Sequence, residues 1–176
     1  MEEKEAEMLL DALVNRAKEM LVRDKKLVPV VFLLLPGKRF NVMPLKFENT
    51  EEKEATVAFV KAVAKGVGAD AIVFISEAWS IMRDKLPEDG SIPRASLAPD
   101  RKECIAATIV TRTGYEGAIT VPFERDKDDT PVFIEAGSGL PKGIYEGAKS
   151  LFSDTFHSGF GIDDYLNPPP EGSTIQ

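Results

Sequence analysis

The first part of the chain alternates between helix-like and strand-like spacing of apolar residues. From Glu3 to Arg23, apolar side chains recur every three or four positions between charged ones, which predicts an amphipathic helix. Two apolar runs follow, Leu27 to Leu35 and Arg39 to Phe47. They flank Pro36-Gly37-Lys38, and a turn sequence in that position predicts a β-hairpin.

A second helix is predicted directly after this hairpin. Asn49 precedes Glu52 by three residues, which resembles a capping box with Asn in place of Ser or Thr. Apolar residues then continue at helical spacing through Val63. Gly66 or Gly68 is the expected end, because glycine is the usual left-handed residue after a helix.

The rest of the patterned region reads as strands. Ala69 to Trp79 is nearly continuously apolar, so we expect a strand that is buried on both faces. Glu103 to Arg112 and Glu116 to Glu124 flank Thr113-Gly114-Tyr115 and predict a second hairpin. Pro131 to Ile134 is a candidate for a short further strand.

These elements together predict an α+β fold. Short hairpins favour antiparallel pairing, and helices packed on one side of a single sheet satisfy the two-layer rule. We therefore expect a single, mostly antiparallel, five-stranded sheet in the order α-β-β-α-β-β-β. That order is similar to the roadblock and profilin-like group of small α+β domains, on topology alone, so it implies no function.

Three segments carry a more specific resemblance: LVPVVFLLLPGKRFNVMPLKF, GADAIVFISEAW and DRKECIAATIVTRTG. They resemble a set of prokaryotic and phage proteins that share a strand ending in Ser-Glu-Ala-Trp. The similarity covers roughly residues 5 to 126 and implies no activity and no catalytic residue.

The chain divides into a predicted α+β domain at 1–135 and a C-terminal extension at 136–176 that is rich in Gly and Pro. The extension is acidic and aromatic, so it either docks on a protein partner or packs back on its own domain. Gly137 to Gly143 superficially resembles a phosphate loop. It lacks the Gly-Lys-Ser/Thr ending, and Pro141 removes one amide, so we interpret it as a linker.

Composition limits the classes of function that this chain could have. The net charge of −7 argues against nucleic-acid binding, which needs a basic surface. The longest apolar run, Val28 to Leu35, is too short to span a membrane, and the acidic N-terminus is no signal peptide, so we expect a cytoplasmic protein. Cys104 is the single cysteine, which excludes an intramolecular disulfide, and its apolar neighbours predict an inert buried thiol.

The candidate site lies where the apolar strand ends. Alternation places Glu77 and Trp79 on one strand face, and a carboxylate so close to a buried run needs water or a partner. Arginines at 83, 94, 101 and 112 are candidate counter-ions. Either Glu77 anchors a ligand beside Trp79, with Arg101 and Arg112 as further ligand-binding candidates, or a Glu–Arg pair ties the long loop at 83–101 to the sheet. The second interpretation is favoured.

Glu103 is the remaining candidate. If its strand pairs with that of Glu77, two carboxylates suit a divalent metal or acid–base work, but Arg101 and Lys102 beside it favour a solvated charge cluster. His157 is the single histidine and cannot form a zinc site alone. We therefore predict no metal and no cofactor, and assign no catalytic residue.

The leading hypothesis is a non-enzymatic binding or protein-interaction module that forms a homodimer through a sheet edge or the first helix. One alternative is an enzyme with a Glu77-centred acid–base site under the 83–101 loop. Another is a phage or mobile-element protein that modulates a host partner through the C-terminal extension.

Overall fold

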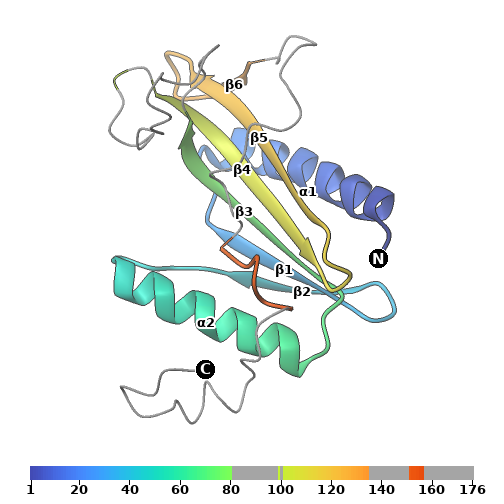
Figure 1. Cartoon of the computed structure of the whole chain (residues 1–176). Helices are drawn as coiled ribbons and strands as arrows, with labels where there is room; N and C mark the ends of the chain where they lie inside the picture. Colours follow the sequence, from blue (N-terminus) through green and yellow to red (C-terminus); the bar gives the residue numbers. More distant parts are fainter. Residues whose placement is uncertain (81–98, 100, 135–150, 157–176) are drawn as a thin grey trace, which may run out of the picture.

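The computed structural model describes residues 1–80, 99, 101–134 and 151–156 of the chain, and these residues contain two helices and six strands (Figure 1). The elements are α1 (Glu3–Asp24), β1 (Val30–Leu35), β2 (Arg39–Pro44), α2 (Thr50–Gly66), β3 (Ala71–Ser80), β4 (Lys102–Thr111), β5 (Glu116–Arg125) and β6 (Pro131–Phe133). The α+β class and the order of the elements are confirmed.

The strands form one sheet in the order β2-β1-β3-β4-β5-β6, and each neighbouring pair is antiparallel. The predicted count of five strands is wrong by one. The sixth strand is β6, which lies at the candidate segment Pro131 to Ile134 and pairs Phe133 with Phe123 of β5 after a turn in which Asp129 has a φ of 61°. A three-residue strand is too short for its alternation to be distinctive in the sequence.

The two helices pack on opposite faces of the sheet, so the prediction that they share one side is wrong. On β3, Val73 and Ile75 join the core beneath α1, whereas Ile72 joins the core beneath α2. Since β3 is apolar on both faces, each face needs its own cover. The structure therefore has three layers, with the sheet in the middle.

Helix α1 covers only part of its face. It packs on β3, β4 and β5 through its buried stripe and runs beside them in Figure 1. On that same face, Phe40 and Val42 of β2 are 45% and 51% exposed. The outer strand β2 is thus only partly covered on the side where Phe40 and Val42 lie.

Local sequence signals fix the boundaries of α2. The side chain of Asn49 accepts a hydrogen bond from the Glu52 amide at 2.9 Å, and the Glu52 carboxylate accepts one from the Glu48 amide at 2.7 Å. At the other end the helix stops at Gly66, and Gly68 adopts a φ of +66°. Both predicted ends of this helix are confirmed.

A short piece of the C-terminal extension packs on the α2 face. Phe152 is 0% exposed and meets Phe74 edge to face, with 5.9 Å between ring centroids. Asp154 forms an ion pair with Lys61 of α2. Residues 151–156 therefore pack back on the domain. The Gly137–Gly143 segment and His157 lie outside the described residues.

Candidate functional site

Arg125 joins two carboxylates at one end of the sheet. Its Nη2 lies 3.2 Å from Glu77 Oε2, and its Nε donates to Glu103 at 3.2 and 3.1 Å. All three side chains are half-buried, at 21%, 26% and 28% exposed for Arg125, Glu77 and Glu103. We call these three residues the Arg125 cluster.

Strand register explains why these residues meet. Glu77 pairs with Ile105 and therefore lies diagonal to Glu103, which itself pairs with Phe123. Arg125 follows Phe123 by two positions, so alternation places it on the same face. That is the α1 face, since Phe123 and Ile105 belong to the core beneath α1.

The cluster also holds the chain that leaves α1. Lys25, which ends α1 in a left-handed conformation with a φ of 57°, accepts a hydrogen bond on its carbonyl from Arg125 Nη1 at 2.9 Å. The Leu27 amide donates to Glu77 Oε1. Both carboxylate oxygens of Glu77 are therefore engaged, one by a main-chain amide and one by a guanidinium.

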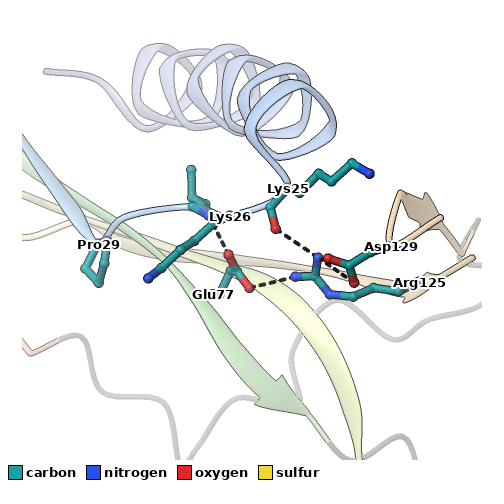
Figure 2. Close-up of a pocket in the computed structure, with 7 residues that line it drawn as sticks. Lys25, Lys26, Pro29, Glu77, Arg125 and Asp129 are labelled. Carbon is teal, nitrogen blue, oxygen red and sulfur yellow. Dashed lines mark hydrogen bonds and ion pairs between the residues drawn. The ribbon is translucent and has the colours of Figure 1, made fainter.

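An open depression of ≈ 480 Å³ lies beside the cluster (Figure 2). It is lined by Lys25, Lys26, Leu27, Pro29, Glu77, Arg125 and Asp129. The lining carries both signs of charge, and Figure 2 shows Glu77 and Asp129 turned toward the guanidinium of Arg125. The acidic groups drawn there thus face a cation of the same chain.

Electrostatics keep Arg125 charged. Partial burial opposes its charge, but the hydrogen bond to Glu103 and the nearby Asp129 and Glu77 outweigh that effect and raise its pKa above the ordinary value. A guanidinium in this setting is a permanent cation, and it offsets part of the negative charge of the carboxylates around it.

The other predicted site residues fall in two places. Trp79 is 44% exposed, and the guanidinium carbon of Arg101 lies 4.4 Å from the centre of its ring. Trp79 lies next to the Arg125 cluster, because it pairs with Glu103 across β3 and β4. Arg112 lies at the opposite end of the sheet, where it donates to the Ala69 carbonyl at 3.0 and 2.9 Å. Positions 83 and 94 lie outside the described residues.

The profile of the family described as "Bacteriophage lambda protein ea47" matches residues 1–135. The chain belongs to this family. The match covers most of the chain and agrees with the resemblance to phage proteins inferred from sequence. No curated protein and no solved structure matches the chain, so the similarity of this family member to the roadblock and profilin-like group stays a prediction from topology.

The structure allows metal binding by this ea47-family chain to be assessed. Among the residues that the structure describes, no group of three or more His, Cys, Asp and Glu side chains is arranged to hold a metal ion. The guanidinium of Arg125 lies where a metal between Glu77 and Glu103 would need to be.

No helix in the described ranges is both long and apolar enough to cross a membrane.

Sequence reasoning did not single out Arg125. A signal was present, because Arg125 follows Val121 and Phe123 at two-residue steps and so ends an apolar strand face with a cation. The partner of that cation depends on the pairing of β3, β4 and β5, which the sequence does not reveal.

Proposed function

We propose that this member of the bacteriophage lambda protein ea47 family is a non-enzymatic protein-interaction module that forms a homodimer through β2. The main support is the exposure of Phe40 and Val42 on an outer strand. Such side chains beside unpaired main-chain groups are typical of a strand that pairs with another chain. The cytoplasmic location stays a prediction.

The two sheet edges differ in a way that favours β2. Among the described strands, β2 and β6 are the outer ones. Strand β6 has three residues and begins with Pro131, which has no amide to donate. Strand β2 has six residues and carries its proline, Pro44, at the end. Among the described strands, β6 is thus the better protected edge and β2 the less protected one.

The contacts of Glu77 support a structural role for the Arg125 cluster. Its oxygens bind the Leu27 amide and Arg125, which ties the α1–β1 connection to the sheet. A general base has to offer an oxygen to a substrate proton. In this arrangement each oxygen of Glu77 already accepts a hydrogen bond from the protein, so a substrate would have to use the remaining lone pairs.

Sedimentation velocity over a concentration series into the tens of micromolar tests the proposal. We expect the wild-type protein to shift from monomer toward dimer as its concentration rises. Val42→Lys places a charge on the proposed edge and should return the protein to monomer. Val132→Lys is the matched control, because Val132 is 54% exposed on the opposite edge. A wild-type protein that stays monomeric throughout would overturn the homodimer.

An enzyme centred on Glu77 is a second candidate, favoured by the depression beside it. A ligand that binds there would raise the melting temperature of the native state. A stabilising ligand whose effect is lost in Glu77→Gln would support this candidate over the module. A host protein that binds the β2 edge would compete with self-association. The stoichiometry of the complex distinguishes this case from the homodimer.

A further inference from the structure

The hydrogen bonds of β2 fix which of its main-chain groups face outward. The Leu45 amide donates to the Pro29 carbonyl at 2.7 Å, one step beyond the Val30–Pro44 pair. Bonding to a given neighbour alternates along an antiparallel strand. Arg39, Asn41 and Met43 therefore bond toward β1, like Leu45, and the residues between them do not.

Phe40 and Val42 are these intervening residues, and each directs an N–H and a C=O away from β1. Pro44 is in the same phase but has no amide to donate. The outward edge of β2 therefore offers complete donor and acceptor sets at Phe40 and Val42, followed by an acceptor alone. Among the described residues no strand pairs with this edge.

We propose that two copies of the chain pair their β2 strands antiparallel about a two-fold axis at Asn41. Phe40 of each copy then lies opposite Val42 of the second copy. This inference rests on the proposed self-association and adds its register. The two sheets join into one continuous sheet across the axis.

Hydrogen bonding favours the axis at Asn41 over the next permitted position, Val42. With the axis at Asn41, each Phe40–Val42 pair exchanges both of its bonds, so every outward N–H and C=O of these residues is used. With the axis at Val42, Phe40 faces Pro44 of the second copy. The missing amide of Pro44 leaves the Phe40 carbonyl unpaired.

Side chains and charge agree with this register. Phe40 and Val42 point to the face that α1 leaves open, and an aromatic residue opposite a β-branched one is a favourable cross-strand pair. Arg39 is the only charged residue of β2 and lies opposite Met43 of the second copy. No like charges face each other, although the whole chain carries −7. A second copy thus meets a strand that lacks carboxylates.

Disulfide trapping tests the register. In a non-hydrogen-bonded antiparallel pair the two Cα atoms are about 4.5 Å apart, which is within reach of a disulfide. Asn41→Cys should therefore form a covalent dimer on mild oxidation, several-fold faster than Val42→Cys or Met43→Cys. The wild-type protein is the blank for Cys104, which is 1% exposed.

A mixed experiment provides a second measurement if Asn41→Cys folds poorly, with folding checked by circular dichroism of the reduced proteins. Arg39→Cys and Met43→Cys should cross-link when mixed and much less when oxidised separately. A dimer by sedimentation that cross-links best at Val42→Cys, or at none of these positions, overturns the register and leaves self-association intact. A wild-type protein that is monomeric by sedimentation overturns both.

Discussion

The guanidinium of Arg125 contacts the carboxylate of Glu77 at 3.2 Å, although the two residues are 48 positions apart and β4 lies between their strands. The contact crosses over β4 at one end of the sheet. Through Lys25 and Leu27, the same two side chains also bind the connection between α1 and β1. A long-range tie of this kind links the ends of elements that are far apart in the sequence.

Replacing Arg125 should destabilise the fold. Arg125→Met removes the cation from two half-buried carboxylates and leaves Glu77 and Glu103 facing each other. We expect the free energy of unfolding to fall by about 2 kcal/mol, between the values for exposed and fully buried pairs. Urea unfolding measures this change.

Two further variants separate the ion pair from a general loss of packing. Arg16→Met removes an exposed cation that pairs with Glu19 on α1 and should change stability by less than about 0.5 kcal/mol. Adding Glu77→Gln to Arg125→Met should recover part of the loss, because one of the opposed charges is removed. A double variant less stable than Arg125→Met would argue against charge repulsion in the cluster.

Phe152 should contribute to the stability of the domain, although it lies in the C-terminal extension. Its ring is 0% exposed against Phe74, so Phe152→Ala should lower the free energy of unfolding by about 3 kcal/mol. Met8→Ala shortens a side chain that is 66% exposed and serves as the control, with little expected change. Equal effects of the two substitutions would show that the Phe152 contact is not made in solution.

Acid should weaken the contact between α2 and residues 151–156. The hydrogen bond and charge of Lys61 hold the pKa of Asp154 below its ordinary value. A lowered carboxyl pKa contributes stability that is complete above the unfolded pKa of about 4 and is lost as the pH falls through the folded value. Urea unfolding at several pH values should show a shallower acid loss for Asp154→Asn than for wild type. Identical slopes would contradict the contribution of this pair.

Cys104 should be unreactive in the native protein. Burial in β4 raises the pKa of its thiol, which lowers the thiolate fraction, and the side chain is also inaccessible. Ellman's reagent at pH 8 should therefore label the thiol only after unfolding in urea. Rapid labelling of the native protein would mean that the β3–β4 region opens readily.

The elements of this fold were predictable because their signals are local. The Asn49–Glu52 cap, the glycine after α2 and the turn at Pro36-Gly37-Lys38 act within a few residues. Burial of β3 on both faces was also evident from its apolar run. The structure confirms these elements because each depends on a short-range sequence pattern.

The parts that were not predicted depend on pairing between distant strands. Arg125 meets Glu77 only because β4 lies between their strands, and the placement of the helices on opposite faces depends on the same sheet order. The periodic pattern of a helix predicts a buried stripe, but it does not predict which face of the sheet that stripe packs on. The candidate site was therefore located at Glu77 without its principal partner.

Amide hydrogen exchange measured residue by residue at increasing protein concentration tests the central claim most directly. The Phe40 and Val42 amides point away from β1, so pairing of β2 between copies should slow their exchange as concentration rises. The Asn41 and Met43 amides already bond to β1 and serve as the internal reference. Exchange at Phe40 and Val42 that does not depend on concentration, in a range where the account predicts dimer, would contradict pairing through β2.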